Sequence, residues 1–229
     1  MLVCDFGTGA FANYRRCLPC PELDAVVISH MHADHFLDLI SLRNALSYGQ
    51  QRRGTKLPVY LPASGEQWLR GVGVAVGSDS HKDFFNEVFD IKAYDAGCTL
   101  VIADFQLSFA KTVHYIDAYA IRVQTKRGAI TYSADTAPCA NVVNLARDSD
   151  LFVCECTLGA NGSESGRRGH SSAREAALMA EEAHVGKLLL THYGSESSPQ
   201  HLVAEASRYF TAECDAADDL MQLRVPDAR

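Results

Sequence analysis

Residues 29–35 read Ser-His-Met-His-Ala-Asp-His, and this segment constrains the chain more than any other. It places four metal-ligand side chains, those of His30, His32, Asp34 and His35, within six residues. Imidazole and carboxylate donors suit a borderline-soft divalent cation such as Zn²⁺. Four donors are too many for one tetrahedral ion that keeps an open coordination position. The segment therefore predicts a centre of two metal ions.

The segment lies between a predicted strand and a predicted helix. Residues 23–28 form an apolar, β-branched run with the length of a buried strand. Residues 36–46 space their apolar side chains three and four apart, which favours a helix. Isolated surface histidines usually bind no metal, but chance does not produce this density of donors. We therefore expect the donors in a strand-to-helix turn.

Three further strand ends carry donors. We expect His114 at the end of an alternating strand, just before another strand over 118–123. Residues 128–136 are typical of a strand whose closing turn presents Asp135, and residues 187–193 of a strand that ends at His192. Taken alone, a histidine or aspartate at a strand end could equally well make only local hydrogen bonds. Their common position suggests a shared site.

These motifs resemble those of the metallo-β-lactamase superfamily, whose His-x-His-x-Asp-His segment binds two metals. The later motifs are similar to those of endoribonuclease Z and its phosphodiesterase-like relatives, and here they are Cys-Glu-Cys-Thr at 154–157, Gly-His-Ser-Ser at 169–172 and Thr-His at 191–192. The resemblance implies an α+β fold, a four-layer αββα sandwich. That family usually opens with a β-hairpin, whereas the Asp-containing turn here follows Met1 almost at once. We therefore expect the first strands to be missing, or the sheet edge to be completed by a partner, such as a second copy in a homodimer.

The resemblance also implies a division of the ligands between two ions. The first ion would take His30, His32 and His114, and the second Asp34, His35 and His192, with Asp135 bridging both. Zn²⁺ is the expected metal, and ligand chemistry leaves Mn²⁺ and Fe²⁺ open.

Catalytic helpers follow from the same resemblance. His170 would give a proton to the leaving oxygen, and Glu155 would hold the tautomer of a histidine. Other readings exist, because His170 could merely precede a helix cap at Ser171 or Ser172, and Glu155 could pair with an arginine. Two ions would supply a bridging hydroxide for attack on phosphorus, which Asp34 would help to position, and Arg167 or Arg168 would orient the phosphate.

Composition narrows the substrate class. The chain has 229 residues, enough for the single domain that we expect over 1–229, and a formal net charge of −7. An acidic chain is a poor general nucleic-acid binder. Residues 57–112 also lack the basic arm of tRNA-processing endoribonucleases, so a small phosphodiester or a short nucleic acid is the expected substrate. The sequence shows no export signal or membrane-spanning stretch, which predicts a cytoplasmic protein without a membrane partner.

Two other functions stay open. A lactam, lactone or thioester hydrolase would use the same two ions on a carbonyl group, although such enzymes generally lack the Gly-His-Ser-Ser stretch. A catalytically silent, truncated fold would act as a binding module, although a degraded site normally loses ligands. The metal content would separate that module from an enzyme.

Overall fold

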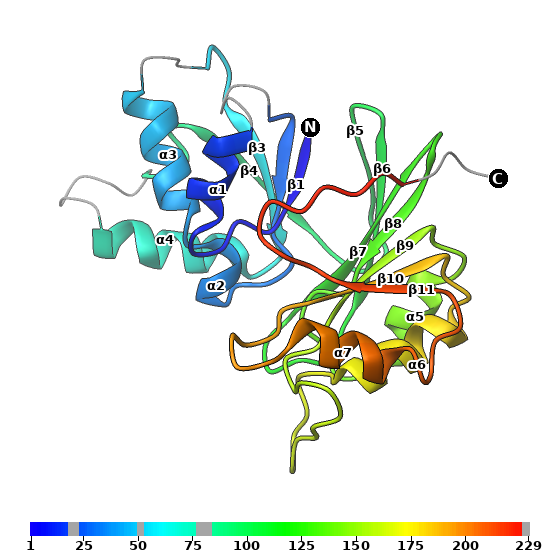
Figure 1. Cartoon of the computed structure of the whole chain (residues 1–229). Coiled ribbons are helices and arrows are strands. Elements are labelled where there is room, and N and C mark those ends of the chain that lie inside the picture. The colour runs from blue at the N-terminus through cyan, green and yellow to red at the C-terminus, as the bar shows by residue number, and fades with distance from the viewer. Residues whose placement is uncertain (18–22, 50–52, 77–83, 226–229) are drawn as a thin grey trace. The chain divides into compact units, whose positions relative to one another are not determined.

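The structure, a computed structural model, describes residues 1–17, 23–49, 53–76 and 84–225. Its contacts divide the chain into two compact units, Met1–Asp95 and Ala96–Arg229, and each is described by itself (Figure 1). The single domain expected over residues 1–229 stays a prediction. In the described part of the chain, no helix has the length and apolar character needed to cross a membrane.

Unit 1 is built on a parallel sheet of four strands. In spatial order these are β1 (Leu2–Cys4), β2 (Ala25–Val27), β3 (Leu57–Pro62) and β4 (Phe89–Tyr94). The predicted buried strand is confirmed, since β2 lies inside the apolar run and its three side chains are fully buried. Its carboxyl end leads directly into residues 28–35, which carry the metal-ligand motif.

Helices connect the strands of unit 1. They are α1 (Ala10–Cys17), α2 (Ala33–Phe36), α3 (Leu39–Tyr48) and α4 (Gly65–Val76). The helix expected over 36–46 is largely confirmed, although it begins at Leu39, after the single turn of α2. The chain after β1 interrupts the helix, because the backbone of Phe6 donates to the carbonyl oxygen of His35 at 2.7 Å and accepts from the N–H of Asp38 at 3.1 Å. The chain after β1 thus packs against the backbone of the donor segment.

Unit 2 contains a sheet of seven strands. Along the sheet their order is β11 (Glu213–Ala216), β10 (Lys187–Thr191), β9 (Leu151–Glu155), β8 (Gly128–Tyr132), β7 (Tyr119–Thr125), β6 (Phe105–Lys111) and β5 (Thr99–Ile102). Strands β8 to β11 are parallel, and β7 is antiparallel to both β6 and β8. Strands β6, β8, β9 and β10 therefore end at the same edge of the sheet.

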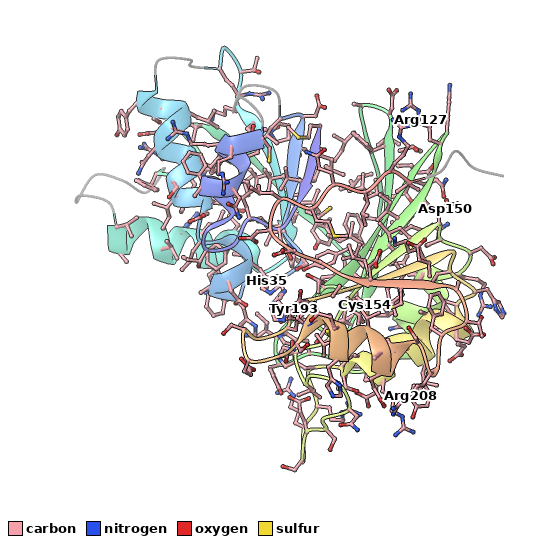
Figure 2. The ribbon with its side chains drawn as sticks, viewed as in Figure 1. His35, Arg127, Asp150, Cys154, Tyr193 and Arg208 are labelled. Carbon is pink, nitrogen blue, oxygen red and sulfur yellow. The ribbon has the colours of Figure 1, made fainter. Side chains whose placement is uncertain are left out.

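Three helices, α5 (Ala140–Ala146), α6 (Ala173–Glu182) and α7 (Pro199–Ala206), lie along one face of this sheet (Figure 1). Their apolar faces and the strands enclose the core of unit 2, which includes the buried thiol of Cys154. Figure 2 shows Cys154 within the unit and Arg208 on its outside. Ser172 and Glu175 form a capping box on α6, which the sequence left open, and Ser198 caps α7 with Pro199 in its first turn.

The alternation of apolar residues over 218–225 is typical of a closing strand, but the structure has no strand there. The last strand is β11, and it pairs in parallel with β10, from Lys187 with Glu213 to Leu190 with Ala216. After β11, Leu220 has a φ of 63°, which breaks an extended chain, and its side chain is 38% exposed. An apolar alternation alone predicted a strand there, but strand pairing occurs a few residues earlier.

Candidate metal centre

The donor segment of unit 1 presents two pairs of ligand atoms. Nε2 of His30 lies 3.2 Å from Nδ1 of His32, and Nε2 of His35 lies 3.5 Å from Oδ2 of Asp34. His30 and His35 are buried, whereas Asp34 is exposed. All four donors follow β2 within eight residues, as the sequence predicted.

Asp5 organises this segment, and the sequence analysis missed it. Its Oδ2 accepts from Nδ1 of His35 at 2.7 Å and from Oγ of Ser29, also at 2.7 Å. Because the Ser29 hydroxyl donates to Asp5, it accepts from Nδ1 of His30 at 3.0 Å. Asp5 thereby orients two imidazoles, one of them through Ser29. The available signal was its position after β1, which pairs in parallel with β2, so the two strands end side by side.

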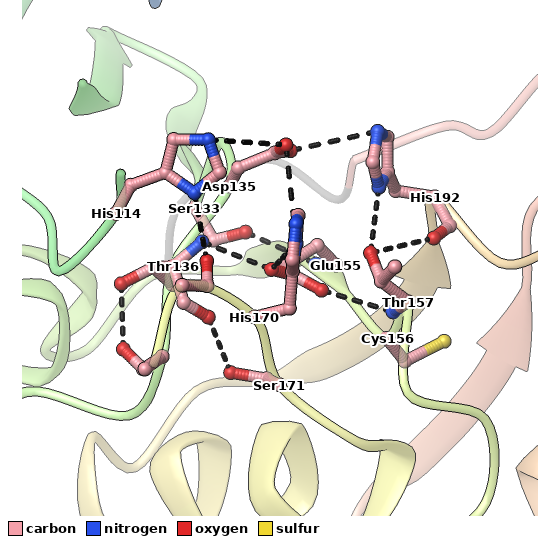
Figure 3. Close-up of polar contacts among 12 residues, drawn as sticks. His114, Ser133, Asp135, Thr136, Glu155, Cys156, Thr157, His170, Ser171 and His192 are labelled. Carbon is pink, nitrogen blue, oxygen red and sulfur yellow. Dashed lines mark hydrogen bonds and ion pairs between the residues drawn. The ribbon is translucent and has the colours of Figure 1, made fainter. Parts of the chain in front are cut away.

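In unit 2, His114 and His192 lie on either side of Asp135 (Figure 3). Nε2 of His114 is 3.8 Å from Oδ2 of Asp135, and Nε2 of His192 is 3.6 Å from Oδ1. Each oxygen of this buried carboxylate thus has its own imidazole. The arrangement follows from the shared edge of β6, β8 and β10, which brings together residues up to 78 positions apart.

Backbone and hydroxyl groups hold these two histidines. Nδ1 of His114 donates to the carbonyl oxygen of Gly169 at 2.8 Å. Nδ1 of His192 donates to Oγ1 of Thr157 at 2.7 Å, and Thr157 in turn donates to the carbonyl oxygen of His192 at 3.1 Å. Partners of this kind orient metal-binding histidines and select the tautomer with its lone pair on Nε2. Four of the predicted histidine ligands (His30, His35, His114, His192) have their Nδ1 bound in this way.

Left-handed backbone recurs at these positions. Asp5, Ala134 and His192 have φ values of 61°, 51° and 55°, although none is glycine. Such conformations are unfavourable for residues with a Cβ and persist where the surroundings enforce them, often at functional sites. Other turns of the chain show them too, but these three directly shape the donor loops.

His170 and Glu155 form a hydrogen-bonded dyad beside Asp135. Nδ1 of His170 donates to Oε1 of Glu155 at 2.9 Å, and the same nitrogen lies 3.9 Å from Oδ2 of Asp135. The carboxylate of Glu155 is itself fixed by the backbone N–H groups of Thr136 and Thr157, each at 2.9 Å. Burial lowers the pKa of His170, but the hydrogen bond and charge of Glu155 outweigh it and raise that pKa above its usual value.

The alternatives for these two residues are resolved in part. Ser172 caps α6, as one reading of the Gly-His-Ser-Ser stretch expected, and His170 still points to Glu155. Arg168 donates to Oε2 of Glu175 at 2.8 Å and to the carbonyl oxygen of His170 at 3.2 Å. Arg167 donates to the carbonyl oxygen of Tyr115 at 2.9 Å. Both arginines thus make structural contacts, and their expected role toward a phosphate stays a prediction.

A family model described as the Beta-lactamase superfamily domain matches residues 2–193. The chain belongs to the metallo-β-lactamase superfamily. The match runs through both units and includes all the predicted ligands as well as Glu155 and His170. The predicted resemblance is therefore confirmed.

Two relatives match nearly the whole chain. The probable metallo-hydrolase YhfI of Bacillus subtilis is 28% identical over 223 residues, which cover 94% of this chain and 84% of the relative. The ribonuclease Z of Brevibacillus brevis is 28% identical over 266 residues, which cover 91% of this chain and 81% of the relative. With these relatives and its His/Asp cluster, the superfamily member described here is a metallo-hydrolase by class.

Solved structures give the same fold. The crystal structure of Bacillus subtilis YhfI, a metallo-β-lactamase fold protein, matches with a TM-score of 0.81 at 28% identity, covering 95% of this chain and 85% of that one. A diphosphatase of the PhnP family matches with a TM-score of 0.73 at 18% identity, covering 99% and 81%, which shows the fold alone. The predicted α+β fold of the metallo-β-lactamase type is thus confirmed.

The donors of both units suit the divalent metals that this superfamily implies. Two nitrogens bound to one tetrahedral zinc ion lie about 3.3 Å apart, given Zn–N bonds of about 2.0–2.1 Å. The 3.2 Å between His30 and His32 is close to this value, and it also suits a hydrogen bond when no ion is bound. Within unit 2, Nε2 of His114 and Nε2 of His192 lie 3.8 and 3.6 Å from the two oxygens of Asp135. Imidazoles with a carboxylate between them are a ligand set for such metals.

Proposed function

We propose that this chain is a metal-dependent phosphodiesterase that cleaves small phosphodiesters or short nucleic acids. The observation that carries the proposal is the buried carboxylate of Asp135, which has Nε2 of His114 near one oxygen and Nε2 of His192 near the other. A carboxylate flanked in this way is suited to bridge two cations. His114 would bind one of these cations and His192 the other.

The proposed ligand assignment is that of the sequence analysis. His30, His32 and His114 would hold one ion, Asp34, His35 and His192 the other, and Asp135 both. Zn²⁺ suits the donors, and Mn²⁺ or Fe²⁺ would also bind them. When bound, two such ions acidify a water molecule and neutralise the charge on phosphate oxygens.

The chain's own residues supply the proton for the leaving group. Since Nδ1 of His170 donates to Glu155, Nε2 is the ring atom that exchanges protons with a substrate. As the phosphorus–oxygen bond breaks, the leaving oxygen takes the proton from Nε2, and water later restores it. The negative charge of Glu155 stabilises the protonated ring between these events. The exposed carboxylate of Asp34 would help to orient the attacking water.

Two observations favour a phosphodiester over a carbonyl substrate. Ribonuclease Z of Brevibacillus brevis, which matches 91% of this chain, acts on RNA by its name. The dyad of His170 and Glu155 also places a proton donor beside Asp135, as cleavage of an unactivated phosphodiester requires. An assay of a phosphodiester beside a chromogenic β-lactam compares the two substrate classes directly.

The test starts from protein purified without added metal. Elemental analysis is expected to find about two ions per chain, and the same sample should hydrolyse bis(p-nitrophenyl) phosphate. The variant His170→Ala should keep its metal and lose at least about 100-fold in turnover of diphenyl phosphate, whose poorer leaving group depends on a proton donor. His201→Ala, which changes an exposed histidine on α7, is the matched control and should behave as wild type.

Two outcomes would contradict the proposal. Metal with turnover of a chromogenic β-lactam alone would assign the chain to the carbonyl hydrolases. Absence of bound metal, even after incubation with Zn²⁺, Mn²⁺ or Fe²⁺, would favour a binding module.

A further inference from the structure

A carboxylate on the loop between β9 and α6 holds the backbone of His170. Oε2 of Glu164 accepts from the backbone N–H groups of Gly169 and His170, at 2.7 and 3.0 Å. Its Oε1 accepts from the hydroxyl of Tyr115. Burial raises the pKa of Glu164, but these three donors lower it to a net value below the usual one, so the group stays ionised at neutral pH. The carboxylate of Glu164 thus links two parts of the same loop through hydrogen bonds to the backbone at His170.

Tyr115 is enclosed by the same loop. A Cβ on Gly169 would lie 2.6 Å from the Tyr115 ring, so the ring packs against bare backbone that no other residue would permit. The guanidinium of Arg167 lies 5.9 Å from the ring centroid and donates to the carbonyl oxygens of Tyr115 and His114, at 2.9 and 3.3 Å. Because Gly169 also accepts from Nδ1 of His114, the loop is attached to the segment after β6 at several points.

Two acidic residues therefore hold His170, one through its ring and the other through its backbone. Glu155 binds its ring nitrogen Nδ1, and Glu164 binds its backbone N–H. The ring hydrogen bond limits rotation of the imidazole, but it does not fix where the Cα atom lies. Glu164 and Tyr115 supply that second constraint. The residues on either side of Glu164 in the loop are small: Gly162, Ser163, Ser165 and Gly166.

We propose that Glu164, anchored by Tyr115, is a positioning residue that holds His170 where it can protonate the leaving oxygen of the substrate. This inference rests on the proposed phosphodiesterase function. Without Glu164, the backbone at Gly169 and His170 would exchange its protein partner for water, and the imidazole would lose alignment with the leaving group. Proton donation depends steeply on such alignment, whereas binding of the phosphate does not.

The first measurement needs no activity. Amide hydrogen exchange at Gly169 and His170 is compared by NMR in wild type, Glu164→Ala and the control Glu182→Ala, which removes an exposed carboxylate of α6. Exchange should be faster by about tenfold in Glu164→Ala, as expected for lost hydrogen bonds to a charged acceptor. Tyr115→Phe, which keeps the ring against Gly169, should give a smaller increase in the same amides. Unchanged exchange in Glu164→Ala would overturn the inference.

The second measurement separates positioning from general loss of structure. Diphenyl phosphate has a poorer leaving group than bis(p-nitrophenyl) phosphate, and so depends more on a proton donor. Glu164→Ala should lower kcat for diphenyl phosphate about tenfold more than for the nitrophenyl ester, with little change in KM. An equal loss on both esters, or no loss, would overturn the inference. If wild type cleaves neither ester, the proposed function fails, and the exchange result alone decides whether Glu164 holds His170.

Discussion

Nδ1 of His170 donates to Oε1 of Glu155 at 2.9 Å, and this contact joins two residues that are 15 positions apart in the chain. Glu155 is the last residue of β9, and its carboxylate is buried. Two backbone N–H groups donate hydrogen bonds to this carboxylate and hold it in place. It therefore acts on the imidazole from a rigid strand end. His170 itself is carried by the loop that leads into α6.

Loss of the charge on Glu155 should impair catalysis more than metal binding. In Glu155→Gln the imidazole loses the anion that stabilises its protonated form, so kcat for phosphodiesters should fall by about 10- to 100-fold. The metal content should stay at the wild-type level, since Glu155 contacts none of the proposed ligand atoms among the described hydrogen bonds. Parallel elemental analysis and kinetics check this, with Glu182→Gln as control. Loss of metal in Glu155→Gln would show that its role lies elsewhere.

Asp5 should control metal affinity without being a ligand. Asp5→Asn keeps the shape of the side chain but weakens the hydrogen bonds to His35 and Ser29. Losses of this kind typically cost 10- to 100-fold in metal affinity. Competition with a chromogenic chelator measures the change, and Asp90→Asn, which removes a half-exposed carboxylate of β4 that pairs with Lys92, serves as control. Wild-type affinity in Asp5→Asn would contradict the role given to this residue.

Asp135→Ala, in contrast, should abolish binding of both ions. Its two oxygens face different imidazoles, so its removal affects both predicted positions at once. His192→Ala removes a donor next to only one of those oxygens and should leave about one ion per chain. Elemental analysis of the two purified variants distinguishes these outcomes. Equal metal contents in the two variants would argue against a bridging carboxylate.

Two glycines should respond to alanine in opposite directions. In Gly7→Ala the new Cβ would meet the carbonyl oxygen of Asp34 at 1.4 Å, so unit 1 should be destabilised by at least about 3 kcal/mol or fail to fold. Gly71 lies on the exposed face of α4, where a Cβ meets nothing within 4 Å. Gly71→Ala should stabilise the chain by about 0.5–1 kcal/mol. Urea unfolding of both variants measures the two effects.

The buried thiols should make the protein sensitive to alkali. Burial raises the pKa of Cys4 and of Cys156 from 9.0 to about 12, with a smaller contribution from the neighbouring acid in each case. Between pH 9 and pH 12 these thiols keep their protons in the folded chain and lose them in the unfolded chain. Stability should therefore decline as the pH rises through this window.

Labelling provides the measurement for the thiols. Iodoacetamide at pH 8 should modify the exposed Cys17 and Cys98 and leave Cys154 and Cys156 intact until the chain is unfolded. The free energy of unfolding measured at pH 8 and pH 10.5 then tests the linkage. Greater stability at the higher pH, or rapid labelling of Cys156 in the folded chain, would contradict the assignment.

Local sequence patterns predicted most of the elements that carry the site. The apolar run before His30 is a buried strand, and the strands expected before Asp135 and His192 are present. The helix cap at Ser172, which the sequence left open, is also present. Alternation and helical spacing report burial over a few residues, so they work well where an element is long and its ends are marked. At residues 218–225 the alternation wrongly predicted a strand. A strand also needs a pairing partner, and β10 pairs with residues 213–216 instead.

By itself, the sequence determined the kind of chemistry: a dense set of imidazole and carboxylate donors at strand ends predicts a metal site whatever the details of packing. Only the tertiary structure decided which residues form the hydrogen bonds that orient those donors and the catalytic histidine. The contacts of Asp5 with His35, of Glu155 with His170 and of Glu164 with Tyr115 span 30, 15 and 49 positions. Hydrogen bonds over such separations depend on how the strands are ordered in each sheet, and no local pattern records that order.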